Sequence, residues 1–256
     1  MPARELLIDA SRAGLPELAH GGYVAGVLAA ALAADSARVR LRRPVPTGRP
    51  LRIERPAEDQ AELHDDGGLL ADAVAAEVLL HLPDPVGPAE AEAASRRFPG
   101  AVHHPFPDCL ACGTRHPDGL RVLPGPVSGR AVVAAHWVPP AGLADRAGVL
   151  PPELVSAALD CPALWALMVH APPESPDRVV TSTLEIRLER PVLAGVPHVV
   201  MAWPIGREGR RRMAGAAILG SDGALCAASR QTTAVVDGWG VPLGRDRWSS
   251  SPVATA

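Results

Sequence analysis

The chain has 256 residues, of which 47% are hydrophobic and 21% are charged, and its formal net charge is −3. This length suffices for one large or two small domains, and the slightly acidic balance does not indicate a nucleic-acid partner. The apolar runs are too short and too often broken by proline and glycine to span a bilayer, and no secretory signal pattern is seen, so we expect no membrane association. Four cysteines in a chain of this size make no disulfide framework, which favours a cytoplasmic location.

The first half is predicted to hold one buried helix and a small antiparallel sheet. Residues 18–33 carry no charge after a His-Gly-Gly motif, which is typical of a helix buried nearly all round. A short strand is expected before it, at 4–11. Apolar and charged residues alternate at 37–43 and 51–55, and an apolar run follows at 69–80, so about three or four further strands are predicted.

The second half begins after a segment at 82–106 that is rich in proline, alanine and glutamate. We expect this segment to be a linker that is helical around 89–97. A second apolar run at 151–170 predicts another long helix, in which Pro162 is a candidate kink. Further strands are expected at 120–123, 130–138, 184–190, 196–203, 212–219 and 225–236.

The two halves match in order. Residues 39–50 (VRLRRPVPTGRP) align with 186–197 (IRLERPVLAGVP), and 66–71 (DGGLLA) align with 222–227 (DGALCA). A period above ~100 residues points to a duplicated domain, with chance similarity of two alanine-rich segments as the alternative. We therefore predict an N-terminal unit with linker at 1–98, a C-terminal unit at 99–237 and a mobile tail at 238–256.

This succession of motifs resembles the hotdog-fold acyl-CoA thioesterases, most closely the phenylacetate-pathway and 4-hydroxybenzoyl-CoA branch. Residues 109–120 (CLACGTRHPDGL) are similar to the Cys-x-x-Cys-Gly-x-x-Asn-Pro-x-Gly-Leu segment of many members, although His116 stands at the asparagine position. The resemblance covers about residues 5–236. It implies an α+β double hotdog, in which each unit has an antiparallel sheet wrapped around one long central helix.

The resemblance also implies a composite catalytic site between the two units. The His-Gly-Gly start of one helix would polarise the thioester carbonyl through backbone N–H groups, with His20 orienting the substrate beside Gly21 and Gly22. The helix of the other unit would supply an acidic residue, Asp160, as general base or nucleophile. Donors at a helix start stabilise a developing oxyanion, and a nearby carboxylate activates water, so this arrangement suits thioester hydrolysis.

Aligning the two helices places Pro152 on Gly21 and Ala29 on Asp160. One junction of the helices therefore keeps both parts of the site, and the opposite junction has lost both. Proline has no N–H to offer an oxyanion, so we expect the opposite site to be inactive. The simpler alternatives are that Asp160 lies on a solvated helix edge and that His20 only caps its helix.

Several polar residues are candidates for substrate binding. Tyr23 lies in the first turn of the first helix, and His116 lies in the cysteine-containing segment. A basic cluster at a predicted turn suits the phosphates of coenzyme A, or it is a solvated hairpin end; it consists of Arg207, Arg210, Arg211 and Arg212.

A zinc site is an alternative for this segment, since Cys109 and Cys112 have metal-ligand spacing and histidines lie nearby in the sequence at 103, 104 and 116. A second cysteine pair is missing and the family likeness explains the segment, so we predict no metal. Cys161 is expected to be core filler rather than a nucleophile.

The sequence thus predicts a hydrolase acting on an acyl-CoA or acyl-carrier thioester, with no cofactor beyond the coenzyme A of its substrate. The alternative is a non-catalytic acyl-CoA-binding or CoA-binding hotdog protein. Sheet edges left by the two units make a homodimer of chains a further possibility.

Overall fold

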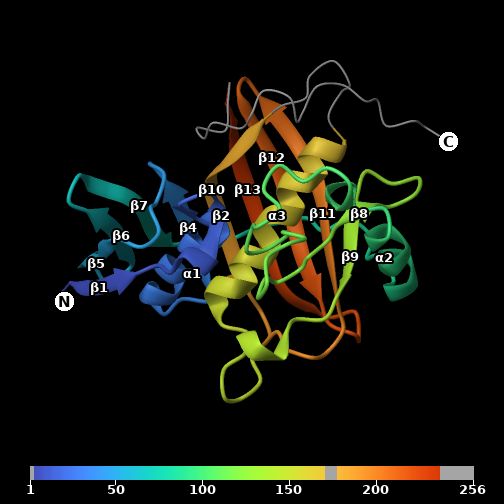
Figure 1. The fold of residues 1–256 in the computed structure, drawn as a ribbon, viewed down its shortest axis with the longest axis horizontal. Coiled ribbons are helices and arrows are strands. Elements are labelled where there is room, and N and C mark those ends of the chain that lie inside the picture. Colours follow the sequence, from blue (N-terminus) through green and yellow to red (C-terminus); the bar gives the residue numbers. More distant parts are fainter. Residues whose placement is uncertain (1–2, 171–177, 237–256) are drawn as a thin grey trace.

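One antiparallel sheet dominates the fold of this computed structural model, which describes residues 3–170 and 178–236 (Figure 1). Its 11 strands follow the order β1-β5-β6-β7-β4-β10-β13-β12-β11-β9-β8. The strands are β1 (Arg4–Leu7), β4 (Ser36–Leu41), β5 (Pro50–Ala57), β6 (Gln60–Asp65), β7 (Gly68–Ala75), β8 (Gly125–Pro126), β9 (Val133–Trp137), β10 (Val179–Leu188), β11 (His198–Glu208), β12 (Arg211–Leu219) and β13 (Leu225–Val235). The remaining strands, β2 (Ala13–Leu15) and β3 (Leu18–Ala19), form a small separate sheet.

Three α-helices lie within the described residues: α1 (Gly21–Leu32), α2 (Pro88–Ser95) and α3 (Pro152–Val169). Short 3₁₀ helices occur at Ala10–Arg12, Pro99–Ala101 and Ala141–Leu143. Strand order is symmetric about the β4–β10 pair, with β7, β6 and β5 on one side and β13, β12 and β11 on the other. Helix α1 precedes β4 just as α3 precedes β10, so the internal sequence match and the strand order follow the same pattern.

Each long helix covers its own part of the sheet. Val24 and Leu28 of α1 are buried against the strands from β4 to β7, in a core that includes Leu63. Helix α3 lies across β10 to β13 (Figure 1) and packs with apolar residues such as Val200 and Ile218. Helix α2 covers the opposite face of β9 and β11. These strands therefore carry apolar side chains on both faces, as expected for strands buried on both sides.

Helices α1 and α3 cross closely because small residues line the contact. A Cβ on Gly22 would lie 2.6 Å from the Asp160 Cβ, and a Cβ on Gly26 would lie 2.3 Å from the Glu153 Cα. No L side chain fits at either glycine unless the helices move apart. This close crossing brings the first turn of α1 against the middle of α3.

Helix α3 is also the one helix among residues 3–170 and 178–236 that is long and apolar enough to cross a membrane by length and composition. It has 18 residues with a mean hydropathy of 1.3, and 72% of that window is buried within the protein. A buried core helix meets the same criterion, so this feature alone is weak support for a membrane span.

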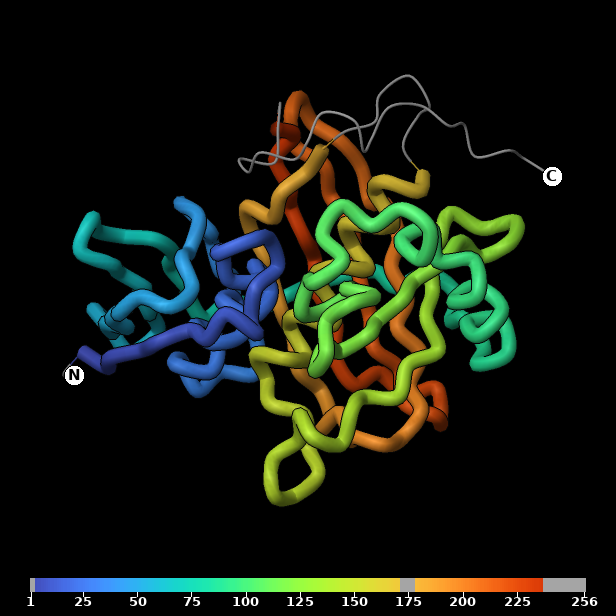
Figure 2. Tube along the Cα trace, viewed as in Figure 1, coloured from blue at the N-terminus to red at the C-terminus, as the bar shows by residue number. Residues whose placement is uncertain are grey.

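The segment between α2 and β9 crosses in front of α3 (Figure 2). The predicted strand at 120–123 within it is wrong, because Arg121 adopts a left-handed φ of 55° that interrupts an extended run. The N–H of Leu120 instead bonds to the Leu110 carbonyl, which folds the segment back on itself. The region at 82–106 is more ordered than a linker, since Val86 and Phe98 are buried in the cores.

Other boundaries differ by a few residues from the sequence predictions. The first helix begins at Gly21 rather than at residue 18, because Leu18–Ala19 pair as β3. Strand β7 ends at Ala75, short of the predicted 80, and α3 is one helix through Pro162. The tail predicted at 238–256 lies outside the described residues.

Candidate active site

Asp160 lies in the middle of α3, is 2% exposed, and faces the first turn of α1. The Gly22 N–H donates to its Oδ2 at 2.7 Å, and the Thr181 hydroxyl donates to its Oδ1 at 2.7 Å. The Gln231 side-chain amide also donates to Oδ1, and it donates to the Thr181 Oγ1 at 2.7 Å. The carboxylate is therefore held by groups from α1, β10 and β13.

Burial and hydrogen bonding act in opposite directions on this carboxylate. Burial raises the pKa of Asp160 above the usual value for aspartate, while nearby His20, the Thr181 hydroxyl and the Gly22 N–H lower it. The net direction is upward. A buried carboxyl with a raised pKa and convergent polar partners has the properties of a general base.

Gln231 has one further property that bears on chemistry. A carboxylate only accepts hydrogen bonds, so the contact with Asp160 requires the amide nitrogen of Gln231 to face it. The other amide atom, Oε1, is buried and has no hydrogen-bond partner among the described residues. An unpaired buried acceptor beside an aspartate is costly unless a water or ligand satisfies it.

His20 is the N-cap of α1, with 3% of its surface exposed. Its Nδ1 lies 3.4 Å from the Tyr23 N–H and 3.6 Å from the Asp160 Oδ2, and its Nε2 lies 3.1 Å from the Cys161 Sγ. Burial by itself lowers the pKa of His20, but the neighbouring Cys109 and Asp160 outweigh it, so the pKa is raised. His20 thus both caps α1 and contacts the carboxylate and a thiol.

The two glycines predicted to polarise the carbonyl have different surroundings. The Gly22 N–H is engaged by Asp160 itself. At the first helical residue, Gly21, no acceptor for the N–H is found among the described residues, and such N–H groups at a helix start have no partner within the helix. A Cβ on Gly21 would lie 3.3 Å from the Asp160 Oδ2, so a side chain at this position would contact the carboxylate.

Tyr23 reaches this site only through its backbone N–H at the His20 Nδ1, and the hydrogen bonds of His116 go elsewhere. Tyr23 is half-buried between the two main cores, and burial raises the pKa of its hydroxyl. His116 is buried, with its Nε2 2.8 Å from the Ser11 carbonyl and its Nδ1 accepting from the Asp118 N–H at 3.1 Å. Both ring nitrogens of His116 are used by backbone groups.

The basic cluster lies at the hairpin between β11 and β12. Arg211 pairs with Ala234 of β13, and Ala214 pairs with Gln231, so the hairpin is three residues along the sheet from Gln231. This spacing corresponds to about 10 Å. Guanidinium groups of the cluster bond to carbonyls of the hairpin and of β13, including Arg210 with the Val235 carbonyl at 2.9 Å.

Thr181 and Gln231 belong to the candidate site, but they are not among the residues predicted from the sequence. The strand at 225–235 carries polar residues at alternate positions, and Ser229, Gln231 and Thr233 are all fully buried. The available signal was the set of polar residues at alternate positions of a strand that lies in an otherwise apolar region. The sequence carries no comparable signal for Thr181, because threonine is common in strands.

The opposite junction of the two helices borders a cavity of about 320 Å³, with Ala29 at the place of Asp160 and Asp35, just beyond the end of α1, as the charged residue of its lining. Its lining includes Ala29 of α1 and Pro152 and Ser156 of α3. The sequence alignment of the two helices places Pro152 on Gly21 and Ala29 on Asp160.

Comparison with known proteins identifies the architecture. No protein-family model matches the sequence, and no curated protein matches it. The structure is similar to acyl-CoA thioesterase II TesB2 from Mycobacterium marinum, with a TM-score of 0.61 and 15% identity over 93% of this chain and 94% of that chain.

The fold is also similar to a conserved protein with the hot dog fold from Alicyclobacillus acidocaldarius, with a TM-score of 0.56 and 14% identity over 92% and 94% of the two chains. The chain has the hotdog fold. A tesB protein from Mycobacterium avium subs paratuberculosis matches this hotdog chain with a TM-score of 0.58 and 13% identity over 86% and 88% of the chains. The fold therefore agrees with the resemblance found in the sequence.

Proposed function

We propose that this hotdog protein is a double hotdog that hydrolyses acyl thioesters at a single composite site between its two units. The observation that carries the proposal is the network of Asp160, Thr181 and Gln231 at the first turn of α1, together with the unpaired Gln231 Oε1. A putative thioesterase II from Thermobifida fusca and the acyl-CoA thioesterase II of Mycobacterium marinum share the fold over about nine-tenths of both chains, and this supports the reaction class.

In this proposal the attacking water sits between Asp160 and Gln231. Asp160 Oδ2 and Gln231 Oε1 are both acceptors, so they would receive the two hydrogens of the water and direct its lone pair outward. Thr181 and the amide nitrogen of Gln231 both donate to Oδ1, whereas Oδ2 accepts the Gly22 N–H and keeps a second lone pair to take the proton. The raised pKa of Asp160 favours this transfer.

The acyl carbonyl would bind at the start of α1. The free N–H of Gly21 is the oxyanion donor in this arrangement, and the helix dipole adds to it. The Gly22 N–H fixes the Asp160 carboxylate instead. The N–H that holds the base and the N–H that would bind the oxyanion therefore belong to adjacent residues. The carbonyl carbon would then lie within reach of the water.

The substrate class is an acyl group on coenzyme A or on an acyl carrier, whose phosphates would contact the basic hairpin about 10 Å along β13. Arginine suits phosphate because its guanidinium makes paired hydrogen bonds. Tyr23, half-buried between the cores, is the candidate wall of the acyl pocket.

The test is thiol release from short, medium, long and aromatic acyl-CoAs by wild type and by Asp160→Asn. We expect turnover that falls by about two orders of magnitude or more in the variant, because a positioned acid–base group contributes on the order of 10²–10⁴. Ser229→Ala, which alters a buried hydroxyl two residues from Gln231, is the matched control and should retain activity.

The competing function is a non-catalytic acyl-CoA-binding protein. It predicts that acyl-CoA binds the wild type without thiol release from any member of the panel. Turnover that survives Asp160→Asn would contradict the role of this residue.

A further inference from the structure

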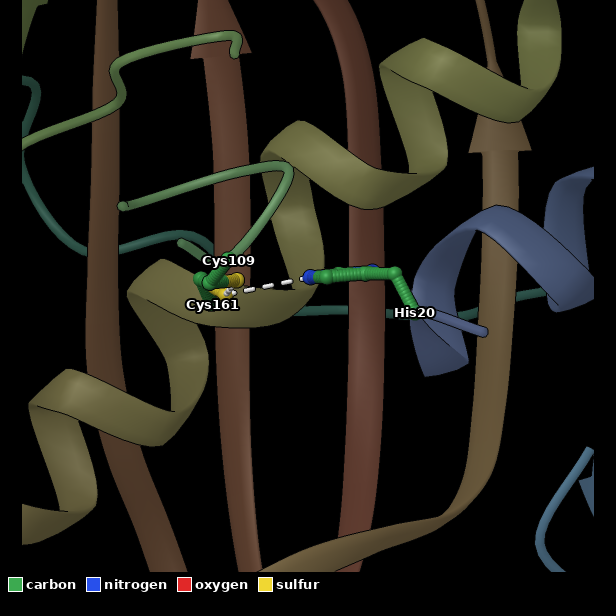
Figure 3. Close-up of side chains that lie close together, drawn as sticks. All are labelled: His20, Cys109 and Cys161. Atoms are coloured by element: carbon green, nitrogen blue, oxygen red, sulfur yellow. Dashed lines mark hydrogen bonds between the residues drawn. The ribbon is translucent and has the colours of Figure 1, made fainter. Parts of the chain in front are cut away.

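A cluster of thiols and imidazoles lies beside the Asp160 network, and the proposed hydrolysis does not use its sulfur atoms. Cys109 and Cys161 are each 5% exposed, and Cys112 is 4% exposed. Figure 3 shows His20 extending from the start of α1 toward the sulfurs of Cys109 and Cys161. The ligand atoms of these three residues all lie within 4.8 Å of one another.

The spacing of these atoms fits a tetrahedral metal site. Zinc–sulfur bonds of about 2.3 Å place the sulfurs of a tetrahedron about 3.8 Å apart. The Cys109 and Cys161 sulfurs are 3.7 Å apart, and the Cys112 and Cys109 sulfurs are 3.8 Å apart. The His20 Nε2 approaches the Cys161 Sγ at 3.1 Å.

The sulfurs of the cluster are shielded from water and lie against one another. The Cys112 thiol donates to the Cys109 Sγ at 3.8 Å, and the Cys109 and Cys161 sulfurs are in contact at 3.7 Å. On the far side of the cluster, His104 accepts the Phe106 N–H at its Nδ1, so its Nε2 carries the proton and donates to the Cys112 Sγ at 3.3 Å. Two cluster sulfurs thus accept hydrogen bonds in a dry environment.

The other nitrogen of His20 completes the arrangement. When the Nε2 of a histidine binds a metal, its Nδ1 carries a proton and usually donates to a carboxylate or carbonyl. In this structure the His20 Nδ1 accepts the Tyr23 N–H at 3.4 Å and lies 3.6 Å from the Asp160 Oδ2, so zinc binding would exchange this helix cap for a proton directed at Asp160. Asp160 therefore occupies the position of a supporting carboxylate.

We propose that His20, Cys109 and Cys161, whose ligand atoms already lie together, bind one zinc ion, with Cys112 turning in from its contact with Cys109 as the fourth ligand. The sequence predicted no metal because Cys109 and Cys112 lack a second cysteine pair, and the remaining ligands come from the starts and middles of distant helices. Three sulfurs and one imidazole form a closed structural set rather than an open catalytic one. The ion would tie the start of α1, the crossing segment and α3 together, and so fix the Gly22 N–H against Asp160.

The experiment measures metal in the full chain purified with reductant and without chelators. Plasma mass spectrometry should find about one zinc per chain. Replacement by Co²⁺ should give a thiolate-to-cobalt charge-transfer band and the intense visible bands of tetrahedral cobalt. Cys161→Ser should lose both the metal and the charge-transfer band.

Cys226→Ser is the matched control, because Cys226 is also 5% exposed but its sulfur faces the Ala224 carbonyl rather than the cluster. This variant should keep the zinc. A wild-type chain that takes up neither zinc nor cobalt, or a cobalt spectrum without thiolate bands, would overturn the proposal even if Cys161→Ser does not fold. A disulfide between Cys109 and Cys161 in the protein purified without reductant, together with absence of metal, would show that the cluster is a redox pair instead.

Discussion

Helices α1 and α3 meet at two junctions, and in each of them the first turn of one helix packs against the middle of the other. The two junctions differ in the side chains that they hold. At one, the first turn of α1 meets the middle of α3, and Asp160 is surrounded by donors from α1, β10 and β13. At the other, the first turn of α3 meets the middle of α1, and Pro152 and Ala29 border a cavity. A buried carboxylate is tolerated only where partners satisfy it, so the carboxylate and its donors had to be kept or lost together.

The strand register extends this comparison. Gln231 of β13 pairs with Leu184 of β10. At the corresponding place on the other side of the sheet, Ala75 of β7 pairs with Ala37 of β4. Ala37 in turn pairs with Ile186 of β10. Ala75 thus takes the place of Gln231 on the other side of the sheet. The opposite junction has alanine where the candidate site has an aspartate and a glutamine. Substitutions at the candidate site should therefore lower activity, whereas substitutions at the opposite junction should not.

The largest expected effect in this comparison, after loss of Asp160, comes from Gln231→Leu. This change removes both the donor to Asp160 and the unpaired Oε1 with little change in volume. We expect kcat to fall by roughly 10²–10³, as for the loss of one positioned polar group in other active sites. Steady-state thiol release measures it. A variant with near-normal kcat would show that Gln231 does not position the water.

A smaller effect is expected for Thr181→Val, which removes one hydrogen bond to a charged group worth about 1.5–3 kcal/mol. The Thr181 hydroxyl lowers the pKa of Asp160, so its loss raises that pKa further. Because the base acts only when ionised, activity is lost as pH falls through this pKa, and the acid limb of kcat/KM should move to higher pH in the variant.

Profiles of kcat/KM against pH for wild type and Thr181→Val test this shift. Ser182→Ala is the neighbouring control, because its hydroxyl donates to the Thr232 carbonyl rather than to Asp160. An acid limb that stays in place in Thr181→Val, or that also moves in Ser182→Ala, would contradict the assignment of Asp160 as the base.

The smallest effect is expected at the opposite junction. Ser156→Ala changes a residue that lines the cavity, on the same helix as Asp160 and one turn before it. We expect kcat/KM within about twofold of wild type, because the hydrogen bonds that hold Asp160 come from Gly22, Thr181 and Gln231 and do not involve Ser156. A loss comparable to that of Asp160→Asn would mean that the chemistry takes place in the cavity.

The parts of the fold carried by strong periodicity could be predicted from the sequence. The charge-free run after His20 and the run before His170 are both helices, and the alternating strand around Ile186 is β10. The segment at 120–123 could not be assigned because its conformation depends on Arg121 adopting a left-handed φ of 55°. Hydrophobic pattern does not report such a local reversal.

The candidate site was predictable only in part. The His-Gly-Gly motif and the acidic residue in an apolar helix singled out Gly22 and Asp160. In the structure the Gly22 nitrogen lies 2.7 Å from the Asp160 Oδ2. Gln231 and Thr181 reach the same carboxylate through sheet register, which depends on long-range pairing. The clustering of Cys161 with Cys109 also follows from the segment crossing α3, and no spacing in the sequence encodes it.

The most direct test of the central claim is the structure of the protein with a non-hydrolysable 2-oxoalkyl thioether of coenzyme A, which keeps the carbonyl of an acyl-CoA but has a CH₂ group between that carbonyl and the sulfur. The account predicts one analogue per chain, with its reacting carbon beside Asp160 and Gln231, its oxygen at the Gly21 N–H and its phosphates toward the β11–β12 hairpin. An analogue bound instead in the cavity lined by Ala29, Pro152 and Ser156 would contradict it.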